Sequence, residues 1–478
     1  MRVAIWPWIA NHRCTGSEAV VFKRRRSCAI SVSLLVFFGT GSPALGQASR
    51  TALRPPSQPA AYRQLAKITA LDGVDGDQFG FCTALAGKIL FASAPFATIG
   101  GNAGQGAIYV YLEPASGWSS TSSYVAKLTA SDGQVDDNLG GGAIAVSTDG
   151  NTIVAGACGQ NHPCVNGTGK AYVFVKPSGG WTDMTETAQL FASDALTANG
   201  FGQSVGISSD TVVIGAPIAN IGGSIQQGAA YVYVKPAGGW TSMTETAKLT
   251  ASDGKGNDIF GEVSAGAAGS VIFVGAPNAI VNRAHAGAGY IYVRPSGGWK
   301  TTSTFAAKLT STDGATGDGL GVCQSGSSCI SSDGNTVLAG APQWNGLQIY
   351  GPGKAYVFVK PASGWTSMTE TAKLTAGDEL FGDAFGWSVA INNTGIAVIG
   401  SVRANALTGK GYIYSKPLTG WTTTSQFRAE LTGSDSGGDD WFGYSVALSG
   451  TNSVVGARAN PWSLTTHYGP GATYIFGQ

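Results

Sequence analysis

The chain has 478 residues, of which 12% are charged and 43% hydrophobic, and its formal net charge is +1 at pH 7. The hydrophobic content excludes a disordered protein. The 71 glycines and the few charges are typical of a turn-rich all-β protein and argue against long amphipathic helices.

The N-terminal segment has the order of a secretory signal. The basic run 23–26 is followed by an apolar run from Cys28 to Phe38, then by Pro43 and the small residues 44–46. The apolar run is about eleven residues long, too short to span a bilayer comfortably. Residues 1–46 are therefore predicted to be a signal peptide, and the alternative is an uncleaved N-terminal anchor. We expect a secreted or cell-surface protein whose mature chain has no membrane span.

The next segment, 47–63, contains Pro55, Pro56 and Pro59 and is predicted to be a flexible Pro-rich leader. Cleavage at residue 46 removes six basic residues and one acid, which leaves 23 Lys and Arg against 27 Asp and Glu. No basic stripe remains to neutralise phosphates, so we expect no nucleic-acid partner.

From residue 64 to the end, a segment of about sixty residues recurs seven times, which indicates one supersecondary unit repeated along the chain. Each copy contains four phrases in a fixed order, and in one copy they start at Phe201 (FGQSV), Thr211 (TVVIGAP), Ala230 (AYVYVKP) and Ala247 (AKLTASD). The first phrase begins at Phe79, Leu139, Phe201, Phe260, Leu320, Phe385 and Phe442, and the third contains Tyr109, Tyr172, Tyr231, Tyr290, Tyr356, Tyr412 and Tyr474.

Each phrase is predicted to be a β-strand. Residues 171–175 are apolar on both faces, as expected between two packed sheets. Residues 126–131 alternate small apolar with polar residues and include Lys127, which suits an exposed edge strand that is protected against pairing with other chains. The Gly- and Ser-rich phrase 386–391 suits a crowded axis. The four strands of each repeat are therefore expected to follow one another from the axis to the rim in the order of the four phrases.

Turn residues support this arrangement. Asp149-Gly150 and Asp333-Gly334 predict tight turns between the first and second strands. A recurring tryptophan joins the third strand to the fourth and is expected to pack between neighbouring sheets; it occurs at Trp118, Trp181, Trp240, Trp299, Trp365 and Trp421.

Seven four-stranded antiparallel sheets in series predict an all-β, seven-bladed β-propeller. An outermost-type strand precedes the first repeat, whereas the last repeat ends at its third strand. Residues 64–71 are therefore predicted to complete the last blade and to close the ring without a covalent link.

These phrases resemble the FG-GAP repeats of the integrin α-subunit propeller and, more closely, those of exported bacterial proteins with LTASDG…DxFG repeats. The resemblance covers residues 64–478 and implies a seven-bladed propeller with a binding role. Integrin-type repeats often carry a calcium loop between the first and second strands, but here that loop is as short as 332–335. Too few oxygen ligands remain there for Ca²⁺ at the usual place, so the sequence assigns no cofactor, and Ca²⁺ at other loops stays an open alternative.

Five cysteines follow the signal segment. Cys158 with Cys164 and Cys323 with Cys329 share a Cys-x5-Cys spacing and are predicted to form local disulfides after export. The alternative for the first pair is a metal site with His162. Cys82 is predicted to be a buried, small apolar residue.

The loops that link one repeat to the next are rich in aspartate. One hypothesis is that these acids shape turns and cap backbone amides. The other is a ring of weak cation sites, with candidates Asp75, Asp77, Asp136, Asp137, Asp258, Asp318, Asp383, Asp439 and Asp440.

The loops between the second and third strands are expected on the same face of the ring, because antiparallel strands reverse at every turn. They vary in length and carry residue types common in recognition surfaces. The candidate ligand-binding residues are His162, Arg283, His285, Trp344, Tyr350, Arg403, Arg458, Trp462, His467 and Tyr468. The alternative for each is packing against a neighbouring loop.

We therefore expect a monomeric, exported binding or adhesion module that recognises a protein or a glycan through this face. The alternative is a polysaccharide-active hydrolase or lyase that uses acids such as Asp137 or Asp440. Because the acids recur in nearly every repeat and no nucleophile elbow, HExxH or phosphate loop stands out, an enzyme is not expected.

Overall fold

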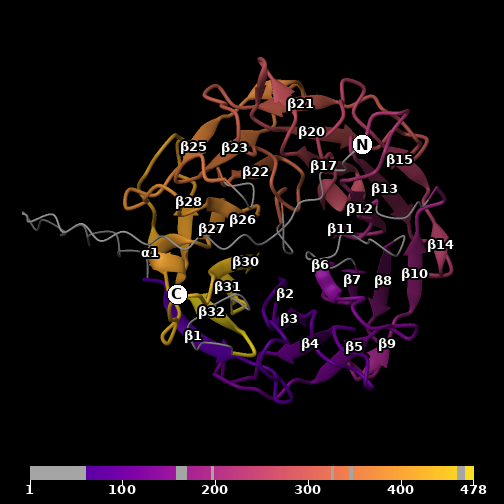
Figure 1. Cartoon of the computed structure of the whole chain (residues 1–478), viewed down its shortest axis with the longest axis vertical. Coiled ribbons are helices and arrows are strands. Elements are labelled where there is room, and N and C mark those ends of the chain that lie inside the picture. Colours follow the sequence, from indigo (N-terminus) through magenta and orange to yellow (C-terminus); the bar gives the residue numbers. More distant parts are fainter. Residues whose placement is uncertain (1–60, 158–168, 195–198, 324–327, 344–347, 460–468) are drawn as a thin grey trace, which may run out of the picture. The chain divides into compact units, whose positions relative to one another are not determined.

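The computed structural model describes residues 61–157, 169–194, 199–323, 328–343, 348–459 and 469–478, so the predicted signal segment 1–46 lies outside the described residues. The strands of each repeat form an antiparallel sheet, and seven such sheets surround one axis (Figure 1). The predicted all-β, seven-bladed propeller is confirmed. Blades are numbered 1 to 7 from the repeat at Phe79 to the repeat at Phe442.

Each blade runs from an innermost to an outermost strand, as the order of the phrases predicts. The innermost strands are β2 (Thr83–Ala86), β6 (Leu139–Val146), β11 (Ser204–Ser208), β16 (Glu262–Gly266), β26 (Phe385–Ile391) and β30 (Phe442–Ser449). The second strands are β3 (Ile89–Ala94), β7 (Thr152–Ala157), β12 (Thr211–Ala216), β17 (Val271–Ala276), β22 (Thr336–Ala341), β27 (Ile396–Ser401) and β31 (Asn452–Ala457).

The third strands are β4 (Ala107–Leu112), β8 (Lys170–Val175), β13 (Ala229–Val234), β20 (Ala288–Val293), β23 (Lys354–Val359), β28 (Lys410–Ser415) and β32 (Ala472–Gly477). The outermost strands are β5 (Ala126–Thr129), β10 (Ala188–Phe191), β15 (Ala247–Leu249), β21 (Ala307–Thr310), β25 (Ala372–Leu374), β29 (Ala429–Leu431) and β1 (Arg63–Ile68). Short helical turns lie at η1 (Ala267–Gly269) and α1 (Ala404–Leu407).

The paired glycines of the FG and GAP phrases let adjacent blades approach closely. A Cβ on Gly156 of blade 2 would lie 1.7 Å from the carbonyl oxygen of Gly202, the FG glycine of blade 3. Gly202 itself has φ of +90°, which other residues rarely adopt. The same close approach recurs at the pairs Gly215 and Gly261, Gly275 and Gly321, Gly340 and Gly386, Gly400 and Gly443, and Gly456 and Gly80.

The ring closes between the two ends of the described chain. β1 pairs antiparallel with β32, with Arg63 opposite Gly477 and Ile68 opposite Thr473. Blade 7 therefore has the strand order β1-β32-β31-β30. The predicted closure is confirmed, although the closing strand ends at Ile68 and does not extend to residue 71.

Blade 5 departs from the predicted four strands. Among its described residues only β22, β23 and β25 are regular strands, and the innermost segment makes single bridges from Val322 to Gly340 and from Ile330 to Val337. The physical reason is extra chain between those two bridges, where a disulfide joins Cys323 to Cys329 across a Cα–Cα distance of 6.0 Å. Cys82 is a free, fully buried thiol, and its burial raises the pKa to about 12.

Neighbouring blades are also joined by strand pairing at the rim, which the sequence analysis did not predict. The short strands β9 (Met184–Thr185), β14 (Met243–Thr244) and β24 (Met368–Thr369) each pair in parallel with the outermost strand of the preceding blade. Glu186 strengthens one such link, because its carboxylate accepts hydrogen bonds from the Ser131 amide and hydroxyl at 2.9 and 2.6 Å. Each of these junctions is therefore linked at the rim as well as by the interblade loop.

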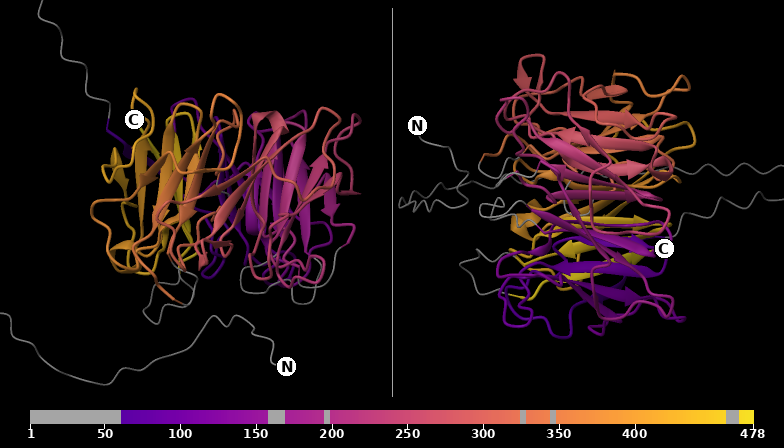
Figure 2. Two further views of the ribbon diagram at one scale, coloured as in Figure 1. Left: turned by 90° about the horizontal axis from the view of Figure 1, so that it is seen from above. Right: turned by 90° about the vertical axis from the view of Figure 1, so that its right-hand side faces the viewer.

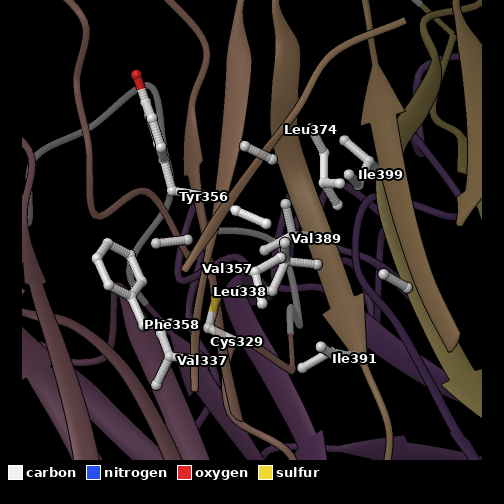
Figure 3. Close-up of a cluster of buried hydrophobic side chains, with 14 of the residues drawn as sticks. Cys329, Val337, Leu338, Tyr356, Val357, Phe358, Leu374, Val389, Ile391 and Ile399 are labelled. Atoms are coloured by element: carbon white, nitrogen blue, oxygen red, sulfur yellow. The ribbon is translucent and has the colours of Figure 1, made fainter. Parts of the chain in front are cut away.

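The hydrophobic core is divided among the junctions. Figure 3 shows part of the cluster that extends over blades 4 to 6, in which Leu338 and Val357 lie with Val389 and Ile399. Trp181 of blade 2 contacts Phe91 of blade 1 edge-on at a centroid distance of 5.4 Å. The recurring tryptophan thus packs between blades there, as predicted.

The strands run from one face of the ring to the other (Figure 2). The interblade loops lie beside the loops that join second to third strands; for example, the Asn138 amide donates to the Gly104 carbonyl at 2.9 Å. We call this side the loop face. The opposite side, which holds the tight turns, is called the turn face.

Candidate functional site

The first aspartate of each interblade loop belongs to a structural triad. In blade 3, Asp194 accepts a hydrogen bond from the Tyr231 hydroxyl at 2.9 Å and forms an ion pair with Lys248. Tyr231 lies on the third strand and Lys248 on the outermost strand, whereas Asp194 arrives from the preceding blade. The equivalent aspartates are Asp72, Asp132, Asp253, Asp313, Asp378 and Asp435, and for Asp132 and Asp378 the paired lysine, Lys170 or Lys410, lies on the third strand.

The electrostatics of the triad favour the ionised carboxylate. Burial raises the pKa of Asp194, but the hydrogen bonds from Lys248 and Tyr231 outweigh burial, so this pKa lies below its usual value. Burial together with the nearby carboxylate raises the pKa of Tyr231. These groups hold blades together, and their charges are already satisfied by one another.

The second acid of the loop caps the loop's own backbone. The Asp77 carboxylate accepts a hydrogen bond from the Val74 amide, three residues earlier, at 3.0 Å. Five other carboxylates, those of Asp137, Asp258, Asp318, Asp383 and Asp440, accept from the amide at the same spacing, at 2.6 to 2.9 Å. This geometry agrees with the hypothesis that these acids cap backbone amides.

The environment of these acids is poor for a cation. Burial raises the pKa of Asp77, Asp258 and Asp383 above the usual value. Of the other cation candidates, Asp75 and Asp136 are exposed on their loops, and Asp439 is half-buried. Among the residues that the structure describes, no group of three His, Cys, Asp or Glu side chains could hold a metal ion.

Three of the candidate recognition residues reach the surface of the loop face. Arg283 and His285 are exposed on the hairpin of β18 (Ile280–Val281) and β19 (Ala284–His285), where His285 Nδ1 lies 3.0 Å from the Asn278 carbonyl oxygen. Tyr350 is 36% exposed on the equivalent loop of blade 5. These side chains can contact a partner without rearrangement of the fold.

Two candidates, by contrast, contact neighbouring loops and are buried or half-buried. Arg458 is 4% exposed; its Nη1 donates to Gln78 Oε1 at 2.7 Å, and its guanidinium carbon lies 4.2 Å from the ring centroid of Tyr444 and 4.5 Å from that of Trp441. Arg403 is half-buried, and its Nε donates to the Gly382 carbonyl at 3.2 Å. Their loop positions suggested exposed side chains, but both arginines support the surrounding loops. Burial lowers the pKa of each guanidinium.

The remaining candidates lie outside the described residues: His162, Trp344, Trp462, His467 and Tyr468, together with the predicted disulfide of Cys158 and Cys164 and its alternative metal site.

Two of the most exposed apolar residues of the loop face were not among the candidates predicted from the sequence. Leu380 and Phe381, at the tip of the interblade loop before blade 6, are 69% and 71% exposed. Their backbone is held firmly: Asp383 accepts from the Leu380 amide, and the Gly382 amide donates to Gly351 at 3.1 Å. The signal was present in the sequence, because most of the equivalent loops carry small or polar residues at these positions.

Comparison with known families places six stretches of the chain in one repeat type. The model of the FG-GAP repeat matches residues 62–111, 123–174, 184–233, 243–292, 368–414 and 426–476. The unmatched stretch 293–367 contains most of blade 5, whose innermost segment is interrupted. Comparison with curated proteins finds no significant match. Among the described residues, no helix is long and apolar enough to cross a membrane.

Proposed function

Because the chain belongs to the FG-GAP repeat family, we propose that it is an exported, non-catalytic binding module of the adhesion type, which recognises a protein or a glycan through its loop face. The observation that supports this most strongly is the rigid loop that exposes Leu380 and Phe381. Large apolar side chains held in the bound conformation are effective anchors, because little conformational entropy is lost on binding.

Neighbouring groups extend this surface. Tyr350 lies on the loop that hydrogen-bonds to the Leu380–Phe381 loop through Gly351 and Gly382. Arg283 and His285 add hydrogen-bond donors on the blade 4 hairpin. Aromatic, apolar and arginine side chains together are the composition of binding surfaces rather than of ordinary turns.

A catalytic role is not supported by the acids of the loop face. A glycoside hydrolase needs a unique pair of carboxyl groups in unlike environments. Here the first acid of each loop is engaged in a triad and the second caps a backbone amide, and both arrangements recur around the ring. Asp137 and Asp440, the acids of the enzyme alternative, both cap amides.

The test is a binding screen followed by matched variants. The purified protein is applied to a glycan array and to a random-peptide display library, and each hit is measured again with Leu380→Ser/Phe381→Ser. Loss of two apolar anchors should weaken binding by about tenfold or more. The control is Leu418→Ser, because Leu418 is fully exposed on the turn face. Equal binding by both variants would refute the assignment to the loop face.

A separate measurement tests the alternative that the protein is a polysaccharide-active enzyme. The same preparation is incubated with a panel of polysaccharides, and the release of reducing ends or unsaturated products is followed. Turnover that is lost in Asp137→Asn or Asp440→Asn would overturn the non-catalytic proposal.

A further inference from the structure

A cavity lies on the axis of the ring toward the turn face. Its volume is about 260 Å³, and its walls come from the first strands and first turns of all seven blades. Thr148 and Gly450, which are exposed among the first turns, form part of the lining, so the cavity reaches the surface there. This site is on the opposite side of the ring from the proposed recognition surface.

The described residues of the lining carry no charge and no aromatic ring. They combine aliphatic side chains such as Leu85, Val205, Ile391 and Leu448 with small residues and hydroxyl groups. An ion would lose part of its hydration here without gaining a counter-charge, which disfavours charged ligands. The absence of an aromatic platform among the lining residues also argues against stacking on a flat ring.

Two hydroxyl groups of the cavity wall are available to a ligand. Ser208 and Ser264 line the cavity, and neither hydroxyl forms a hydrogen bond within the described part of the chain. The hydroxyls of Ser147 and Ser449, in contrast, bond to Asp149 and to the Gly87 amide. Because each hydroxyl can both donate and accept a hydrogen bond and has no protein partner, these two groups are suited to pair with a molecule inside the cavity.

The two serines belong to adjacent blades. Ser208 ends β11 of blade 3 and Ser264 lies within β16 of blade 4. Between them, a Cβ on Gly206 would lie 3.1 Å from the Ser264 Cα atom, so the two strands are in close contact at this level. One small molecule can therefore reach both strands.

We propose that the axial cavity binds a small, uncharged molecule with an aliphatic body and a hydroxyl or carbonyl group that pairs with Ser208 and Ser264. The size is adequate, because an engineered apolar cavity of about 150 Å³ accommodates benzene and this cavity has about 260 Å³. The cavity is separate from the loop face, so this proposal can be tested independently of the proposed function.

The probe is cyclohexanol, which has an aliphatic ring of suitable size and one hydroxyl group. It is titrated into the purified protein while the methyl resonances of Ile207, Ile391 and Leu448 are followed by NMR, with those of Ile108 as a remote reference. We expect saturable shifts of the lining methyls with a Kd of about 1 mM. Cyclohexanecarboxylate and cyclohexylammonium, of the same size but charged, should bind about tenfold more weakly or worse.

Two exposed positions separate occupation of the cavity from general solvent effects. Thr148→Trp places an indole at the mouth and should abolish the shifts, whereas Thr316→Trp, on an exposed loop of the opposite face, should leave them unchanged. Ser264→Ala should weaken binding by about threefold to tenfold while the same methyls respond, because one hydrogen bond is lost.

The proposal is overturned if cyclohexanol causes no saturable shift, which would mean that the cavity holds water only. It is also overturned if the charged analogues bind equally well, or if Thr148→Trp has no effect.

Discussion

The closing strand makes a prediction that can be worked out from one side chain. Ile68 on β1 is fully buried and packs in the cluster shared with Ala447, Val454 and Ile475. Ile68→Ala removes three carbon atoms, which is worth about 2.4 kcal/mol of transfer free energy. The cavity left behind adds roughly 1 kcal/mol, so unfolding should become easier by about 3 kcal/mol.

The expected change in melting temperature follows from the size of the ring. At about 2.1 cal/mol/K per residue, the unfolding entropy of roughly 420 residues is about 0.9 kcal/mol/K. If the ring unfolds as one unit, Ile68→Ala should lower the Tm by about 3 °C. Differential scanning calorimetry and urea titration followed by tryptophan fluorescence measure the two quantities.

The matched control is Leu249→Ala. Leu249 is the equivalent, fully buried residue of β15 in blade 3, where the outermost strand is continuous with its own repeat. The two variants should lose similar stability if β1 is held as firmly as a continuous strand. A loss below about 1 kcal/mol for Ile68→Ala, beside the full loss for Leu249→Ala, would refute closure by β1 in solution.

Three further predictions concern other positions. Burial raises the pKa of Asp313, but hydrogen bonds from Tyr356 and two lysines outweigh it and lower the pKa to about 2. This contributes stability above about pH 4 that is lost as the pH falls toward 2, so Asp313→Asn should lose about 1 kcal/mol at pH 7, after allowance for solvent screening, and unfold with a shallower acid slope; an unchanged slope in urea titrations would contradict this. Burial raises the pKa of Glu379 to about 9, so the folded state retains a proton that the unfolded chain releases, and stability should fall as the pH rises from about 5 to 9. Glu379→Gln should remove that decline, which thermal melts at pH 5 and pH 8 would detect. Replacement of both Cys323 and Cys329 by Ala should lower stability by about 2 kcal/mol, and the reduced native protein should match the variant in urea titrations.

Much of the fold could be predicted because the residues that recur in each repeat have direct physical causes. Gly156 and Gly202 have to be glycines because two blades touch there. The Asp149-Gly150 pair predicts a tight turn because Gly150 adopts a positive φ. The rim pairing through β9, β14 and β24 could not be predicted, because two-residue strands have no hydrophobic period. Blade 5 differs because the stretch from Leu320 to Thr336 is longer than its counterparts, which a strand count does not reveal.

The candidate site was harder to predict, since exposure depends on tertiary contacts. Arg458 lies on a loop, yet three aromatic rings from blades 7 and 1 surround its guanidinium group. Conversely, Leu380 and Phe381 resemble core residues in the sequence but are solvent-exposed. The interblade acids could be interpreted only when Tyr231 and Lys248 were seen to meet Asp194 across a junction.

The pairing of β1 with β32 makes the junction that closes the ring equivalent to the other junctions between blades. Arg63 lies opposite Gly477, so a short linker could join these two positions in a chain that starts at Arg63. New termini opened before another outermost strand would then leave every blade with its full set of hydrogen bonds. The ring should therefore tolerate circular permutation, with the new termini placed at the outermost strand of any blade.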